Sequence, residues 1–470
     1  MFNLVFLYAF SLGLLLANVY CFIKKKYLYL FIPCMLFLPR FYGVEISDKL
    51  PILTVSRMMH IVFYIYAFIN RRRDYKIKKI SLKIIPKEYW LLAGYFALRL
   101  LSNLYYITTY SHAPKSFLLI VFEQLFLLLA VYMLAPTKKE LVVLTKVVVW
   151  AATVLFAVGI IESMVGARPF DALYTVSRNL YNLYYYRLGL LRATTTMYAP
   201  SLYGNMCVLM IPLIMFLYEV EKKNRYLVIA GLDILAIIHS ASRSDILFLF
   251  VIAVAYVCVF YRDRQRVFLF AKNCGLIVAT LSLYICVTSL ISENLNYFYV
   301  GTGKSVLNEV GFDFDLNEGA PENTKGFGNN KNGGVSRTRQ FTAISSVMKE
   351  NPLFGYGAGA TGRKQVKYFW HHSDGRDEWI TATSYDVGIV ETVCEEGLFG
   401  LLGVCCLIFF LIANSRGNKY LKIAVACYLL STLSSGNMYP FLMLYTVFAL
   451  CDSNGVIKAR NNDKGEGLVL

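Results

Sequence analysis

The sequence predicts an all-α polytopic membrane protein with about 12–13 transmembrane helices and a large, partly helical loop on the outer side. Hydrophobic residues make up 57% of the 470 residues and charged residues only 16%, whereas a soluble domain is about 45–50% apolar and about 25% charged. The apolar residues occur in runs of about 20, the length at which an α-helix crosses the hydrocarbon core of a bilayer. A bilayer is therefore the expected environment of this chain.

The apolar runs predict about thirteen spans along the chain. They cover residues 2–23, 27–44, 50–69, 89–110, 116–135, 141–162, 199–219, 226–241, 244–261, 267–291, 398–413, 420–434 and 438–451. The first run is followed by lysines and lacks a small-residue cleavage site, so we expect a span there and no cleavable signal. The predicted organisation is a membrane bundle over 1–291, a large outer loop over 292–397, C-terminal spans over 398–451 and an inner tail over 452–470.

Basic residues predict the orientation of these spans. The net charge is +17, and the basic clusters fall in alternate loops, as the positive-inside rule requires. The clusters are Lys24–Lys26, Arg71–Arg73, Lys138–Lys139, Lys222–Lys223 with Arg225, Arg262 with Arg264 and Arg266, and Arg416 with Lys419. The N-terminus is thus expected outside and the C-terminus inside. This pattern favours topogenic charge and contact with membrane lipids, and no nucleic-acid partner is expected.

The 11 cysteines do not predict a metal site or a disulfide framework. Most of them fall within apolar runs, and no CxxC or other metal-ligand spacing occurs. They are expected to be small buried apolar side chains. No metal and no cofactor is therefore predicted.

Four predicted outer loops have compositions that merit attention. They cover residues 163–198, 240–244, 292–397 and 434–440. The first contains Tyr174, Tyr181 and Tyr184–Tyr186 at near-helical spacing, which predicts an interfacial helix. In the large loop, the glycine-rich stretch 301–334 predicts irregular structure. Helical patterns follow from about 337 to 350 and from 384 to 400.

Arginines in the short outer loops are informative, because the positive-inside rule disfavours them there. Arg243 lies in the tight turn 240–244, and four arginines precede the seventh span: Arg168, Arg178, Arg187 and Arg192. A guanidinium at membrane depth is costly unless it is paired or hydrated, and its planar fork binds phosphate oxygens two at a time. A lipid-linked diphosphate at the outer leaflet would be a natural counter-ion. The alternatives are a local pair between Arg243 and Asp245 or contact with lipid headgroups, and headgroup contact is favoured for Arg178 and Arg187.

Acidic residues and histidines in the large loop are candidates for proton transfer. Asp386 lies at the start of a helical stretch close to the membrane, where it could be a general base or a helix-capping residue. His371 and His372 could also accept a proton, but adjacent residues make a poor metal site. Glu123, in the apolar run 116–135, is an anomaly that we interpret as a cavity or helix–helix contact.

Four motifs in a fixed order, over roughly residues 190–400, resemble those of the O-antigen polymerase and ligase superfamily. Arg192 followed by the Pro-x-x-x-Gly phrase at 200–204 comes first, and the Ser-Arg turn 240–245 second. Arg337 and Arg339 then precede Pro-Leu-Phe-Gly-x-Gly-x-Gly at 352–359. The phrase Glu-Glu-Gly-Leu-Phe-Gly at 395–400 closes the series.

The resemblance implies an inverting, metal-independent glycosyltransferase of the GT-C type. Its donor would be a polyprenyl-diphosphate-linked glycan at the periplasmic face of the bacterial inner membrane. Arg192 and Arg243, helped by Arg339, would hold the diphosphate. Asp386 would accept the proton of the attacking hydroxyl, with His372 and then His371 as alternatives. Ligases of the family have histidine at the position of Asp386, so aspartate there favours a polymerase.

The function expected from this resemblance is polymerisation of lipid-linked repeat units into O-antigen or capsular or exopolysaccharide. A flippase and a chain-length regulator would be its protein partners. The alternatives are a ligase that transfers the glycan to lipid A core or protein, and a transporter or flippase for lipid-linked sugars. A transporter should show inverted repeats and acidic residues within its spans. No repeat is found, and the candidate acids are Glu123, Glu162 and Asp233.

Overall fold

The computed structural model describes residues 2–47, 50–72, 87–176, 184–321, 333–371 and 376–461. Over these residues a helix lies at every predicted span, and seven helical stretches are long and apolar enough to cross a membrane. The prediction of an all-α polytopic membrane protein is thereby confirmed. The bundle consists of α1 (Phe2–Ile23), α2 (Tyr27–Phe37), α3 (Val55–Ile69), α4 (Lys87–Tyr105), α5 (His112–Leu119), the π-helix η2 (Ile120–Leu125), α6 (Phe126–Leu134), α7 (Lys138–Val165), α8 (Pro200–Glu221), α9 (Arg225–His239), α10 (Arg243–Phe260), α11 (Arg264–Ile291), α15 (Gly388–Ala413), the 3-10 helix η6 (Asn414–Arg416), α16 (Tyr420–Ser434) and α17 (Tyr439–Asn461).

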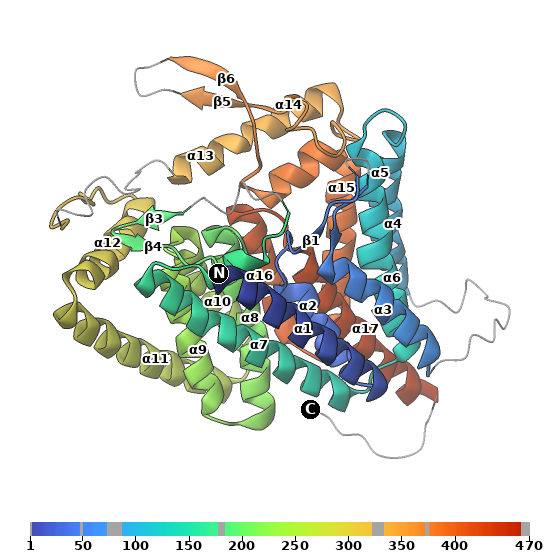
Figure 1. Cartoon of the computed structure of the whole chain (residues 1–470), viewed down its shortest axis with the longest axis horizontal. Helices are drawn as coiled ribbons and strands as arrows, with labels where there is room; N and C mark the ends of the chain where they lie inside the picture. Colours follow the sequence, from blue (N-terminus) through green and yellow to red (C-terminus); the bar gives the residue numbers. More distant parts are fainter. Residues whose placement is uncertain are drawn as a thin grey trace.

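Shorter elements connect the outer ends of these helices. They are β1 (Gly43–Val44), β2 (Leu53–Thr54), the 3-10 helix η3 (Pro169–Leu173), β3 (Tyr186–Arg187), β4 (Leu190–Leu191), α12 (Glu293–Glu309), α13 (Gly333–Gln340), α14 (Thr342–Glu350), β5 (Lys367–His371) and β6 (Asp377–Thr381). The strands form three antiparallel pairs, β1–β2, β3–β4 and β5–β6. Figure 1 shows α13, α14, β5 and β6 lying above the bundle.

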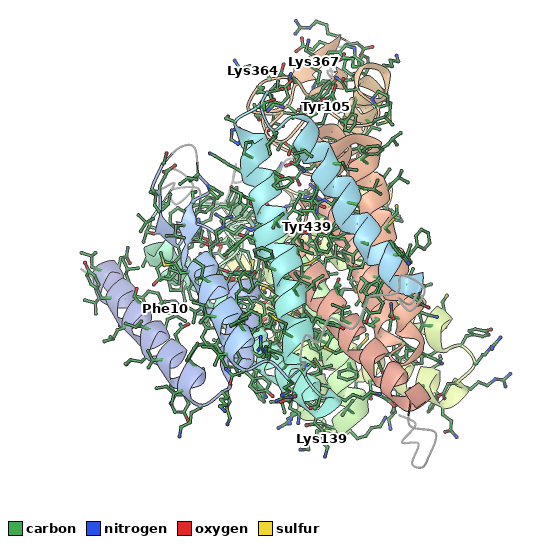
Figure 2. The ribbon with its side chains drawn as sticks, turned by 90° about the vertical axis from the view of Figure 1, so that its right-hand side faces the viewer. Phe10, Tyr105, Lys139, Lys364, Lys367 and Tyr439 are labelled. Atoms are coloured by element: carbon green, nitrogen blue, oxygen red, sulfur yellow. The ribbon has the colours of Figure 1, made fainter. Side chains whose placement is uncertain are left out.

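The two ends of the bundle carry different parts of the chain. Figure 2 shows Lys139, in a predicted cytoplasmic cluster, at the end opposite Lys364 and Lys367 of the large loop. The α7 helix starts beside Lys139 because Thr137 caps it in a capping box with Glu140. The large loop and this basic cluster therefore lie on opposite sides of the bundle.

Burial separates central helices from peripheral ones. In α8, 78% of the most apolar stretch is buried, whereas none of the corresponding stretch of α11 is buried. Figure 1 shows α11 at the edge of the bundle, beside α9. Since α11 is apolar on all sides, its outer face is suited to lipid contact.

Three local predictions from sequence are wrong in detail. The second span was expected to reach residue 44, but α2 ends at Phe37, since Pro39 disfavours a helical conformation before it. In the loop 163–198, the interfacial helix was expected around the tyrosines; Tyr174 follows the 3-10 helix η3, Tyr186 lies in the hairpin β3–β4, and residues 177–183 lie outside the described residues. The glycine-rich stretch is helical only to Glu309, in α12, and residues 310–321 are irregular as expected. In α12, Gly301 allows Leu188 to pack closely, since a Cβ there would lie 2.8 Å from a Leu188 methyl carbon.

Two motif phrases of the large loop dock onto each other through their backbones. α15 is kinked at Gly397, whose φ is +64° and ψ −155°. The freed N–H groups there bond to the turn that follows α14: Leu398 N donates to Pro352 O (2.8 Å) and Phe399 N donates to Leu353 O (3.1 Å). The turn in return donates from Tyr356 N to the Cys394 carbonyl (2.8 Å). This docking holds the outer start of α15 in place.

A buried ion pair supports the same kink from the side. Arg99 of α4 makes a two-pronged contact with Glu396, with Nε–Oε2 2.7 Å and Nη2–Oε1 2.6 Å. Both side chains are almost fully buried, and the Arg99 guanidinium also lies over the Tyr439 ring. Ser102, one turn along α4, donates to the Glu396 carbonyl (3.0 Å). The helices α4, α15 and α17 are thereby joined at one level.

We expect Gly397→Ala to destabilise the protein strongly. Its backbone conformation is accessible essentially to glycine alone, at a cost of about 1–3 kcal/mol for other residues. In addition, a Cβ would lie 2.5 Å from Gly355 N and Leu353 O. Thermal unfolding in detergent should show a lower midpoint or no folded protein. The control is Gly275→Ala on α11, where a Cβ meets nothing within 4 Å; an equal effect of both variants would contradict this account.

Candidate functional site

Four arginines from separate elements meet at the outer side of the bundle. Arg187 lies on β3, Arg192 follows β4, Arg243 starts α10 and Arg337 lies on α13. They are called the guanidinium cluster below. Each is held by a different contact. Their like charges, together with burial, lower the pKa values of Arg187 and Arg192.

The hairpin β3–β4 positions two members of the cluster. Leu188 and Gly189 both have positive φ, as a two-residue hairpin turn requires. The hairpin lies against the turn between α9 and α10. Arg187 Nη1 donates to the Ala241 carbonyl (2.9 Å), and Arg192 Nε donates to the Ser240 carbonyl (2.8 Å). These carbonyls follow the C-terminus of α9, where free carbonyls and the helix dipole favour positive charge.

The other two arginines approach the same turn from the large loop side. Arg243 Nη1 lies 2.7 Å from Glu309 Oε1, at the end of α12. Arg337 Nη1 donates to Ser244 Oγ (3.0 Å), the residue next to Arg243. The Ser-Arg turn is therefore the point at which the cluster assembles.

The electrostatics of the cluster favour an anion. Burial, with the positive charges of Arg243 and Arg192, lowers the pKa of Arg187 to about 9. Burial and the charges of Arg337 and Arg243 likewise lower the pKa of Arg192 to about 10. Lowered values of this kind reflect desolvation and repulsion between like charges. A bound dianion would counteract the repulsion.

The backbone that follows Arg192 is held by a buried acid. Glu162, at the end of α7, accepts hydrogen bonds from Thr194 N (2.9 Å), Thr194 Oγ1 (2.7 Å) and Thr195 N (3.0 Å). Thr195 has a positive φ of 48°, so this turn is one that its partners must stabilise. Glu162 therefore positions Arg192 without touching it.

We expect Glu162→Gln to weaken donor binding rather than the chemical step. The amide NH₂ would replace one acceptor oxygen and leave a backbone N–H unpaired, at a cost of about 1–3 kcal/mol. Activity assays should show a raised donor KM with kcat little changed. Glu219→Gln, at the inner end of α8, is the matched control. A kcat loss without a KM change would contradict the positioning role.

A polar cavity of about 650 Å³ adjoins the guanidinium cluster. Arg337 lines it from the large loop, together with Asp386 and Tyr385. Other walls come from the loop before α8 and from the turn 434–440 between α16 and α17. Since Arg337 also bonds to the turn 240–244, all four outer loops singled out in the sequence meet here.

Two carboxylates from the start of α15 face this cavity. Asp386 is exposed and shares two hydrogen bonds with Gln340: the Gln340 amide donates to Asp386 Oδ2, and Asp386 N donates to Gln340 Oε1, both at 3.0 Å. Gln340 ends α13, the helix of Arg337. Glu391 lies one turn into α15 and accepts from Asn437 Nδ2 (3.0 Å). The pair Asp386–Gln340 couples the candidate base to the helix of Arg337.

The predicted site residues are placed as follows. Arg192 and Arg243 are in the guanidinium cluster, and their role in binding diphosphate stays a prediction. Arg339 lies with its guanidinium 4.4 Å from the centre of the Trp370 ring. Only the backbone of His371 is described, at the end of β5, and His372 lies outside the described residues.

Arg337 and Arg187 belong to the guanidinium cluster but were not predicted as diphosphate ligands. Arg337 and Arg339 are two positions apart, so a helix turns them to different sides, and spacing alone did not tell which one faces Ser244. For Arg187, Gly189 was only a weak turn signal, since Leu-Gly is not among the preferred hairpin dipeptides. The near-helical spacing of the neighbouring tyrosines favoured a helix instead.

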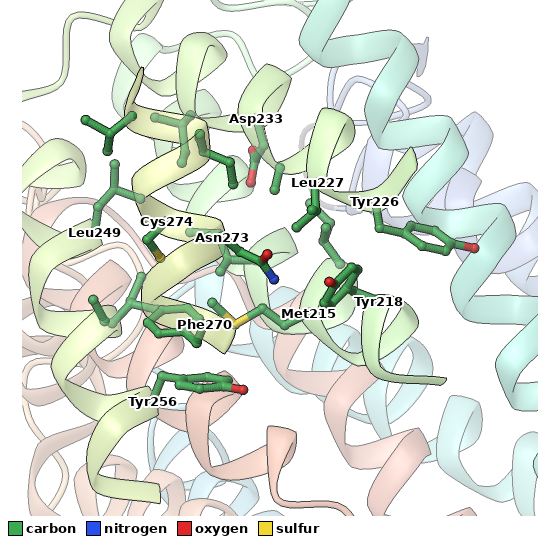
Figure 3. Close-up of a pocket in the computed structure, with 18 of the residues that line it drawn as sticks. Met215, Tyr218, Tyr226, Leu227, Asp233, Leu249, Tyr256, Phe270, Asn273 and Cys274 are labelled. Atoms are coloured by element: carbon green, nitrogen blue, oxygen red, sulfur yellow. The ribbon is translucent and has the colours of Figure 1, made fainter. Parts of the chain in front are cut away.

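An apolar cavity of about 800 Å³ lies on the other side of the Ser-Arg turn, between α8, α9, α10 and α11. Figure 3 shows Leu249, Phe270 and Met215 among the side chains around it. Ile238 and Ile285 line this cavity and also pack against the cluster of apolar residues that includes Ala241. The apolar cavity therefore ends close to the guanidinium cluster.

Comparison with known proteins gives one match, which includes Arg243 and Arg337 of the guanidinium cluster. Residues 227–405 match a family model described as O-Antigen ligase. The match runs from α9 through the large loop into α15. No curated protein and no solved structure matches the chain.

Proposed function

We propose, from the match of residues 227–405 to the O-Antigen ligase family model, that this chain is a polymerase of polyprenyl-diphosphate-linked glycan repeat units. It would act at the outer face of the bacterial inner membrane. The observation that carries the proposal is the guanidinium cluster, which contributes Arg337 to the polar cavity and is linked to the apolar cavity through Ile238 and Ile285. A lipid-diphosphate glycan has three corresponding parts: a charged diphosphate, a polar sugar and an apolar lipid chain.

The proposed binding mode follows from the charges. The diphosphate lies against Arg192, Arg243 and Arg337, whose planar groups suit phosphate oxygens. The sugar extends into the cavity that Arg337 and Asp386 line. The polyprenyl chain lies along the apolar cavity, one wall of which is formed by the peripheral helix α11.

The proposed reaction is a direct displacement. The acceptor hydroxyl forms a bond to the anomeric carbon of the donor as the bond from that carbon to the diphosphate oxygen breaks. Asp386 takes the hydroxyl proton, and the guanidinium groups stabilise the charge on the departing diphosphate. This mechanism needs neither a metal ion nor a nucleotide, since the donor itself carries the leaving group.

A ligase is the second candidate, and the description of the matched family favours it. The aspartate at position 386 favours the polymerase, because the family's ligases have histidine there. Both reactions use the same donor and leaving group, so the guanidinium cluster serves either. The acceptor alone distinguishes them.

A deletion strain, examined by gel for its surface glycan, tests the proposal. Loss of a polymerase should leave single repeat units attached to the final acceptor, and loss of a ligase should leave none attached. Complementation with the wild-type gene should restore the ladder of chain lengths. An unchanged ladder in the deletion strain would exclude both activities.

A further inference from the structure

The polar cavity has a wall that the proposed mechanism does not use. Arg57 and His60 of α3 and Glu123 of η2 form it, and all three line the cavity. They are called the α3–η2 wall. The wall lies outside residues 227–405 and accounts for the anomalous glutamate in the apolar run 116–135.

The charges of the wall compensate each other. Arg57 Nε lies 2.6 Å from Glu123 Oε1, and the two side chains remain 20% and 33% exposed. Arg57 also donates to the Ile52 carbonyl. A neutral pair that is still accessible does not favour a diphosphate, as the guanidinium cluster does. It offers acceptor oxygens and donor N–H groups to uncharged hydroxyls.

The backbone at Glu123 is modified in a way common at functional sites. Residues 120–125 form a π-helix inside an otherwise α-helical span, and π segments occur frequently at such sites. Tyr64 OH donates to the Phe122 carbonyl within this segment. An ionisable residue in an apolar span is costly, so its presence points to a ligand or pathway.

Several buried polar atoms around the cavity have no hydrogen-bond partner among the described residues. They are His60 Nε2, Thr196 Oγ1 and Tyr385 OH, and all three residues line the cavity. Leaving such atoms unpaired is unfavourable. A ligand with several hydroxyl groups would satisfy them together.

We propose that the α3–η2 wall, with Thr196 and Tyr385, is the subsite for the acceptor glycan. This inference rests on the proposed glycosyl transfer. The donor diphosphate would occupy the guanidinium cluster, and the acceptor sugar would lie across the cavity against the neutral wall. Asp386, which lines the same cavity, would then face the attacking hydroxyl.

The test separates the two substrates kinetically, with the full-length protein in nanodiscs. The donor is the lipid-diphosphate repeat unit isolated from a strain that lacks this gene. The acceptor is the same glycan released from its diphosphate by mild acid, so that it cannot act as a donor. The variants are Thr196→Val and the charge-balanced double variant Arg57→Gln/Glu123→Gln. Thr153→Val, whose hydroxyl bonds within α7, is the matched control.

We expect the double variant to raise the acceptor KM about tenfold or more and Thr196→Val to raise it several-fold, with the donor KM unchanged. Thr196→Val loses no hydrogen bond within the protein, so it should fold as the wild type does. A raised donor KM, or no change in either the donor KM or the acceptor KM, would overturn the inference. Glycan transfer by the wild type would still uphold the proposed function.

Binding of the released glycan, measured without donor, gives a second readout. Weaker binding to the variants than to the wild type supports the subsite even where turnover is too slow to measure. Equal binding to the wild type and both variants overturns it. Absence of transfer by the wild type, with intact glycan binding, would count against the proposed function alone.

Discussion

Replacing Arg337 with alanine should lower the rate of glycan transfer by about 10²–10³-fold, the usual effect of removing one preorganised group that stabilises transition-state charge. Arg337 bonds to Ser244 beside Arg243, lowers the pKa of Arg192 and lines the polar cavity. It is thus the cluster member that reaches both the proposed diphosphate and the sugar. The measurement is the initial rate of chain extension on lipid-linked repeat units, at saturating substrate.

Arg339→Ala is the matched control for this prediction, because it lies on the same helix. Its guanidinium lies over Trp370, a contact that contributes about 0.5–1 kcal/mol at an exposed site. We expect a small change in thermal stability and less than about a tenfold change in rate. If Arg339→Ala abolished transfer and Arg337→Ala did not, Arg339 would help Arg192 and Arg243 to hold the diphosphate, as the family resemblance implies, and Arg337 would not.

Asp386→Asn should reduce kcat by about 10²–10⁴-fold, the range expected when a general base is lost. The asparagine keeps the size of the side chain and can still bond to Gln340, so the variant should fold normally. The donor KM should change little, since Asp386 is not part of the guanidinium cluster. Single-turnover rates with preloaded donor would measure the chemical step directly.

Glu391 is the alternative to Asp386 as the general base. It lies in the same cavity, and its carboxylate bonds to Asn437. If Glu391→Gln lost activity while Asp386→Asn retained it, Glu391 would be the base. His371→Ala and His372→Ala test the remaining predicted bases, and either would displace Asp386 if it alone abolished transfer.

Much of this architecture could be predicted from the sequence because membrane insertion depends on local properties. A run of about 20 apolar residues forms a span wherever it occurs, and the basic loops set its direction. Arg192 and Arg243 could be singled out as candidate site residues because each lies next to a span boundary that is recognisable in the sequence. Tyr186, which the tyrosine spacing placed in an interfacial helix, lies instead in a hairpin whose turn residues Leu188 and Gly189 have positive φ.

The spans, the turn that carries Arg243 and the glycine positions follow from the amino-acid sequence alone. Helix packing is needed to show that Arg337 faces this turn, that Gly397 and Gly355 dock together, and that Glu123 meets Arg57 in the cavity of Asp386. The difference lies in the range of the interactions. Hydrophobic length and loop charge act along the chain, whereas ion pairs and cavities join side chains that are close only after the helices pack.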